Sequence, residues 1–167
     1  MSKVLIPLSR GAGVYYKLNA RKAMDIAFVG VAVYLELAGS MVAKARIGLG
    51  AVALTPIRAR QAEAMIEGRP LTPEAVEAAG AQAARESSPI SDLRAGAAYR
   101  REMVAALTRR GLLVAYARAE GRVDHGQIPP AQGRGLDGEI RQSSVLTLAA
   151  TGVIGRVLPG DGGMVAG

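Results

Sequence analysis

The clearest pattern in the chain is a period-two alternation of apolar positions between Ile26 and Leu37, in the stretch IAFVGVAVYLEL. Side chains at every second position lie on one face of a β-strand. That predicted buried face consists of Val29, Val31, Val33, Leu35 and Leu37. Ala38-Gly39-Ser40 has the composition of a turn, and a second strand is predicted from Met41 to Leu54. We therefore expect an antiparallel hairpin with one buried face.

The second predicted strand has the same two-sided character. Lys44 and Arg46 are expected to point away from a buried face formed by Ala43, Ala45, Ile47, Leu49 and Ala51. Weaker strand signals precede the hairpin, at Val4 to Leu8 and at Val14 to Leu18.

Three helices are predicted after the strands. Thr55-Pro56 and Thr72-Pro73 each combine an N-cap threonine with a proline at the first helical position. The expected ranges are from Pro56 to about Glu67 with Gly68 as the cap, from Pro73 to about Glu86, and from about Ala95 to Glu120.

Strands followed by helices indicate an α+β fold, a small antiparallel β-sheet packed on one face by about three helices. The apolar positions of the last helix are Tyr99, Met103, Ala106, Leu107 and Val114. Five arginines are expected to cover much of the remaining surface of that helix: Arg100, Arg101, Arg109, Arg110 and Arg118.

The periodic patterns end near residue 121, so residues 1–121 are expected to form one domain. Residues 122–167 hold 10 of the 21 glycines and are expected to form a Gly-rich, poorly ordered or atypical tail. Two interpretations of this tail stay open: sequence read through a frameshift or a lost stop codon, or a linker to a subunit.

Composition limits the chemistry that the chain can perform. The absence of cysteine excludes disulfides, thiolate zinc sites and iron–sulfur ligation, and His125 is the single histidine. Ser87, Ser88 and Ser91 have no nearby histidine in the sequence, and no spacing pairs two carboxylates for acid–base work. We expect no catalysis from this chain alone.

Charge and hydropathy define the expected surroundings. The net charge is +7, but aromatic residues make up only 4% of the chain, fewer than single-strand-binding surfaces use, so nucleic acid is not the favoured partner. The apolar run from Ile26 to Leu37 is too short to cross a bilayer, and no targeting segment is evident. A cytoplasmic location without a membrane partner is expected.

Three stretches carry a more specific signal. They begin at Tyr16 (YKLNARKAMDIA), at Ile47 (IGLGAVALTPIRA) and at Ser88 (SPISDLRAGAAYRR). In this order and spacing they resemble the C-terminal domain of the FAD-binding medium subunit of molybdenum hydroxylases. This is the carbon monoxide dehydrogenase, xanthine dehydrogenase and aldehyde dehydrogenase flavoprotein family. Departures are small, with Leu54 where relatives commonly have proline and Gly96 where many have serine.

The resemblance implies a small antiparallel sheet backed by three helices, and a role beside FAD. Electrons in this family pass from a molybdenum-binding large subunit through a [2Fe–2S] small subunit to FAD in the medium subunit. The Gly-rich FAD-binding N-terminal domains do not occur in this sequence, so they are expected on a separate or missing chain, and FAD binding by this chain alone is expected to be weak or absent. The resemblance places three residues of this sequence near the flavin: Lys17, Asp25 and Ile26.

The other motif residues have a mainly structural interpretation. Asp92 is expected to cap the last helix or to pair with Arg94 or Arg58, and Tyr99 to pack that helix on the sheet. Arg21 and Lys22 are either solvated charges or contacts to a partner or a flavin phosphate. Two other functions stay open: a stand-alone protein-interaction module without redox activity, and a basic nucleic-acid-binding protein that uses the arginine-rich helix.

Overall fold

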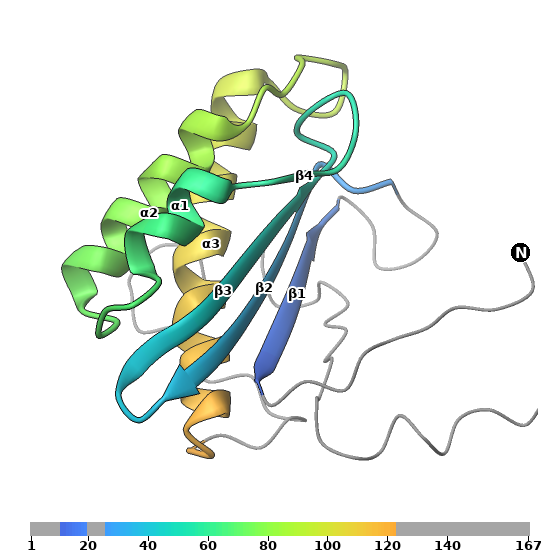
Figure 1. Cartoon of the computed structure of the whole chain (residues 1–167). Helices are drawn as coiled ribbons and strands as arrows, with labels where there is room; N and C mark the ends of the chain where they lie inside the picture. Colours follow the sequence, from blue (N-terminus) through green and yellow to red (C-terminus); the bar gives the residue numbers. More distant parts are fainter. Residues whose placement is uncertain (1–10, 20–25, 123–167) are drawn as a thin grey trace, which may run out of the picture.

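A computed structural model describes residues 11–19 and 26–122 as a sheet layer and a helix layer (Figure 1). The sheet is antiparallel with strand order β1-β2-β3-β4, and the helices cover one of its faces. The strands are β1 (Ala12–Leu18), β2 (Val29–Ala38), β3 (Met41–Gly50) and β4 (Ile57–Arg58). The helices are α1 (Arg60–Ile66), α2 (Pro73–Glu86) and α3 (Ala97–Ala119). The predicted α+β class is confirmed.

The central hairpin forms as predicted, but its register contains an irregularity. Gly39 turns the chain at φ +61, a conformation that glycine adopts without steric cost. The pairing of β2 with β3 shifts between Glu36 and Leu37. This bulge puts Val42 into the core and leaves Ala43 exposed, so the predicted inward orientation of Ala43 is wrong.

The predicted ends of both hairpin strands are also corrected. The first strand begins at Val29 rather than Ile26. The second ends at Gly50 rather than Leu54, because Ala51 has φ +60 and leaves the extended conformation.

Thr55-Pro56 does not start a helix. Ile57 and Arg58 instead form the short edge strand β4, which pairs with Leu49 and Gly48, and α1 begins only at Arg60. The other predicted signals are confirmed. Thr72 Oγ1 accepts a hydrogen bond of 3.2 Å from the N–H of Ala75, and Gly68 has φ +75 after the end of α1.

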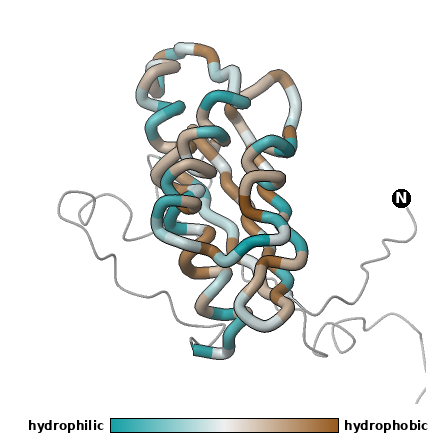
Figure 2. The backbone as a smooth tube through the Cα atoms, turned by 60° about the vertical axis from the view of Figure 1, so that its left-hand side comes forward, coloured by the Kyte–Doolittle hydropathy of each residue, from teal (hydrophilic) through white to brown (hydrophobic). Residues whose placement is uncertain are grey.

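The longest helix, α3, differs from its predicted pattern at both ends. Arg100 and Arg118 are buried instead of solvated, and Tyr99 is partly exposed instead of packed on the sheet. Met103, Leu107 and Val114 are buried as predicted. Figure 2 shows how hydrophobic stretches of the sheet lie behind helices whose turns alternate between hydrophobic and hydrophilic. The core lies between these two layers.

Four sequence predictions fall outside the described residues: the strand from Val4 to Leu8, the position of Asp25, the role of Arg21 and Lys22, and the tail after Arg122. The division at residue 121 therefore stays a prediction. Among the helices of the described residues, none has the length and apolarity needed to cross a membrane.

Candidate functional site

Lys17 lies near the end of β1, on the sheet face that the helices do not cover. Its neighbours Tyr16 and Leu18 are buried against the helix layer, and alternation along the strand directs Lys17 to the opposite face. Lys17 is opposite Gly30 on β2, and Gly30 is opposite Gly50 on β3. The lysine is half-buried there.

The surface next to Lys17 has very little side-chain bulk. Gly30, Gly48 and Gly50 share this face with Ala32, in two adjacent strands. The Tyr15 side chain lies over Gly30, where an added Cβ would come within 2.9 Å of the Tyr15 hydroxyl oxygen. Glycine lets another group approach the backbone closely. Because Tyr15 covers the buried Gly30, the half-buried Gly48 and Gly50 are the glycines of this face suited to close contact with a flat group or another backbone.

Two of the three residues predicted to lie near the flavin, Lys17 and Ile26, lie at the two ends of the connection between β1 and β2. The N–H of Phe28 donates a hydrogen bond of 2.8 Å to the carbonyl oxygen of Leu18, which closes this segment at its base. Lys17 lies one residue before that bond and Ile26 two residues before Phe28, with the Ile26 side chain 61% exposed. The fold thus brings the ends of the motif to one edge of the domain, while Asp25 lies outside the described residues.

Three segments meet at this edge, which we call the loop end: residues 26–28, 51–56 and 87–96 (upper part of Figure 1). The N–H of Ser88 donates to the carbonyl oxygen of Val52 at 2.8 Å, which joins two of them. Four large apolar side chains are exposed here: Ile26, Leu54, Ile90 and Leu93. A group of exposed apolar side chains is typical of a surface that another protein part covers.

Asp92 organises the third segment of the loop end. Its Oδ1 accepts hydrogen bonds from the N–H groups of Arg94 (2.8 Å) and Ala95 (3.1 Å), and lies 2.7 Å from Nη2 of Arg100. The Arg94 N–H and then the Arg100 guanidinium lower the pKa of Asp92 to about 2. Asp92 is therefore an ionised structural group.

The detailed partners of Asp92 differ in part from those expected. The Arg94 guanidinium is 3.8 Å away, so that predicted pair is present but is looser than the pair with Arg100. Arg58 instead pairs with Glu63. The first helical residue of α3, Ala97, is capped by Ser91, whose Oγ accepts its N–H at 2.9 Å.

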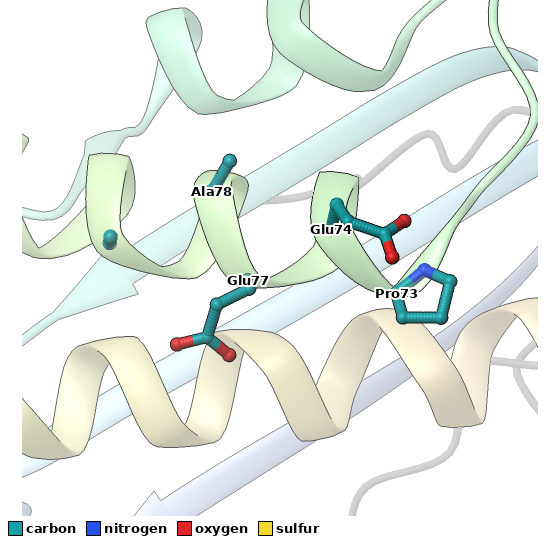
Figure 3. Close-up of a pocket in the computed structure, with 5 residues that line it drawn as sticks. Pro73, Glu74, Glu77 and Ala78 are labelled. Carbon is teal, nitrogen blue, oxygen red and sulfur yellow. The ribbon is translucent and has the colours of Figure 1, made fainter.

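A surface depression on the helix layer offers little chemistry. It is a shallow hollow of about 520 Å³ on α2, lined by Pro73, Glu74, Glu77, Ala78 and Ala81 (Figure 3). It is on the helix layer, whereas Lys17 is on the opposite sheet face, and its Glu77 pairs with Arg109 of α3. Within residues 11–19 and 26–122, no cluster of three or more metal-ligating side chains occurs.

Comparison with known families identifies the fold. The family model described as the CO dehydrogenase flavoprotein C-terminal domain matches residues 14–115, more than half of the chain. The chain belongs to this family. The match begins just before Tyr16 and includes all three stretches on which the sequence resemblance was based.

Individual relatives agree with this membership. The carbon monoxide dehydrogenase medium chain of Hydrogenophaga pseudoflava is 34% identical over 119 residues, which are 71% of this chain and 42% of that protein. A putative xanthine dehydrogenase FAD-binding subunit of Escherichia coli K12 is 28% identical, over 70% of this chain and 40% of that protein. A structure of carbon monoxide dehydrogenase from H. pseudoflava superposes with a TM-score of 0.62 at 40% identity, covering 66% of this chain and 38% of that one. The chain thus spans about two fifths of the length of these relatives.

Proposed function

We propose that this chain is the C-terminal domain of an FAD-binding medium subunit of a molybdenum hydroxylase, and that it covers the flavin from one side. The observation that carries the proposal is the family match over residues 14–115. The matched part includes Lys17, the glycines of the sheet face beside it, and all of β1 except Ala12 and Gly13. The FAD-binding portion that the relatives have beyond the matched part would come from another polypeptide or from a missing part of this one.

The described residues fit a flavin at the Lys17 face. The half-buried Gly48 and Gly50 leave the backbone of β3 accessible to a flat ring system, and Tyr15, which covers Gly30, offers an aromatic surface beside them. Bound FAD would accept and donate electrons, the chemistry that the cofactor itself supplies. Lys17 would place a positive charge near the ring, Ile26 would contribute an apolar contact, and Asp25 would lie close by.

The exposed apolar side chains of the loop end support a covered surface in the assembled enzyme. We infer that the flavin-binding portion packs on this end, next to Ile26. The large molybdenum-binding subunit and the small [2Fe–2S] subunit complete the proposed complex. This assignment is consistent with relatives that are named as medium chains or as FAD-binding subunits.

The structure weakens the basis of the nucleic-acid alternative. Of the five arginines expected to decorate α3, Arg100 and Arg118 are buried, Arg109 pairs with Glu77, and Arg110 lies over the ring of Tyr16 at 5.5 Å. Charges engaged in this way are poorly placed to neutralise phosphates.

The test is to replace Lys17 in the tagged chain and to isolate the protein, with its associated partners, from the cells that produce it. Lys17→Met is expected to shift the flavin midpoint potential downward, because a reduced anionic flavin would lose a nearby positive charge. Lys44→Met is the matched control, since Lys44 lies at the far end of β3 and pairs with Glu36. Equal potentials for wild type and Lys17→Met would contradict the assigned role of Lys17. A colourless wild-type complex would favour the interaction-module alternative.

A further inference from the structure

We propose that Arg100 is a positioning residue of the flavin site, which holds residues 26–28 against the other two segments of the loop end. This inference rests on the proposed function, because it concerns the backbone beside Ile26.

The contacts of Arg100 connect all three segments of the loop end. Its Nη1 donates to the carbonyl oxygens of Ala51 at 3.2 Å and Phe28 at 3.5 Å, and its Nη2 lies 2.7 Å from Asp92 Oδ1. Phe28, Ala51 and Asp92 are distant in sequence but converge on this one side chain. Only 4% of Arg100 is exposed, although its partners Ala51 and Asp92 lie at the surface.

The two carbonyl groups belong to points where the backbone leaves the sheet. Phe28 precedes the first residue of β2 and closes the β1–β2 segment through its bond to Leu18. Ala51 follows the last residue of β3 and has φ +60. The ladder of regular strand hydrogen bonds ends at such points, so a side-chain donor there restricts backbone motion that the sheet itself does not.

The shape of the guanidinium group explains why arginine is needed at this position. Its planar fork can reach acceptors on separate segments at once, whereas a lysine ammonium is a single point with different geometry. Asp92 supplies the compensating charge and is itself fixed by the N–H groups of Arg94 and Ala95. A line of contacts thus runs from the 87–96 segment through Arg100 to the backbone beside Ile26.

A buried arginine is a poor way to gain stability alone. Its Nε is buried and has no acceptor among the described residues, and an apolar side chain of similar size would often serve folding as well. Instead, Arg100 fixes the positions of the backbone segments that it contacts. The residues of a cofactor site must be held close to one geometry.

Hydrogen exchange on this chain tests the contact network. Arg100→Lys keeps a positive charge for Asp92 but loses the fork, and we expect roughly tenfold faster exchange at the hydrogen-bonded amides of Phe28 and Ser88. Amides in the middle of β2 and β3, such as those of Val33 and Ile47, should keep their protection. Arg101→Lys is the control, since Arg101 is the next residue of α3 and is exposed. Unchanged protection at Phe28 and Ser88 in Arg100→Lys would overturn the proposal, and Asp92→Asn provides a second variant that should loosen the same amides.

The flavin readout separates positioning from a purely structural role. In the complex isolated from its own cells, Arg100→Lys is expected to change the absorption spectrum and midpoint potential of the bound flavin, whereas Arg101→Lys leaves both as in wild type. Faster exchange with an unchanged flavin spectrum would overturn the positioning role. Absence of flavin from the wild-type complex would contradict the proposed function instead, and the exchange result would still report on the contacts of Arg100.

Discussion

Glu63 is a charged residue whose burial the sequence pattern does not predict. It is 3% exposed, and its Oε1 accepts hydrogen bonds from the N–H of Ile47 (2.8 Å) and from Arg58 Nε (3.0 Å). Glu63 thereby joins α1 to β3 and to the edge strand. Patterns of apolar and polar positions assign charged residues to the solvent, because they contain no information on partners reached through the fold. Arg100 and Arg118 were misassigned for the same reason.

Replacing Glu63 by alanine is expected to destabilise the domain by about 2–4 kcal/mol, because the buried N–H of Ile47 and the Arg58 guanidinium would lose their acceptor. Denaturant unfolding followed by circular dichroism measures this change. Glu77→Ala is the control, because its pair with Arg109 is exposed and should contribute little. Similar losses in both variants would argue against a special role of the buried carboxylate.

At the scale of elements, the sequence predicted the parts whose signals are local. The β2–β3 hairpin with its Gly39 turn and α2 with its capping threonine formed as expected, apart from the strand ends and the orientation of Ala43. The bulge at Glu36 and Leu37, the edge strand β4 and the late start of α1 depend on pairing between distant segments. Thr55-Pro56 is a valid local start signal that tertiary pairing of Ile57 with Leu49 overrides.

The contact of α3 with the sheet depends on Gly111. A Cβ at Gly111 would lie 2.6 Å from Cγ2 of Val33 and 3.7 Å from Cγ1 of Val14. Gly111→Ala is therefore expected to push α3 away from the sheet, with a net loss of about 1 kcal/mol after the better helix propensity of alanine is included.

Thermal and denaturant unfolding of Gly111→Ala would measure this loss. Gly48→Ala serves as the control, because its Cβ would meet only Cβ of Ala32, at an ordinary 3.7 Å. A Gly111→Ala variant as stable as Gly48→Ala would show that the helix–sheet distance adjusts without cost.

At the scale of the whole molecule, the domain is two-sided. Helices cover one sheet face, and the other carries Lys17 and a glycine-lined surface next to the exposed loop end. The sequence resemblance selected Lys17, Asp25 and Ile26, and among the described residues the fold places Lys17 and Ile26 at the same edge. The third motif stretch contains Arg100, but the resemblance did not show that Arg100 connects three segments. The carbonyl groups that Arg100 contacts lie 49 and 72 positions away in the sequence.

Acid should destabilise the domain through carboxylates whose pKa values the fold lowers. The N–H of Ala45, and then Arg46, lower the pKa of Glu67, and Asp92 has a pKa of about 2. Because these pKa values are lower in the folded than in the unfolded state, the stabilisation is complete above their ordinary values of 4.5 and 3.8. It is lost progressively as the pH falls toward the folded values.

Melting temperatures measured from neutral pH down to about pH 2 are expected to fall below pH ~4.5. The double variant Glu67→Gln, Asp92→Asn should be less stable at neutral pH and should show a shallower acid slope. An acid slope identical to that of wild type would mean that other groups control acid stability.

The most direct test of the proposed flavin-covering role is the FAD content of the chain isolated under mild conditions from the cells that make it. Absorbance of the released flavin and quantification of the chain would give their molar ratio, and intact mass would identify the polypeptides present. We predict about one FAD per chain, since a medium subunit with a single flavin site contains one copy of this domain. A stable complex of the chain with its partner polypeptides that holds no flavin at any purification step would contradict the account.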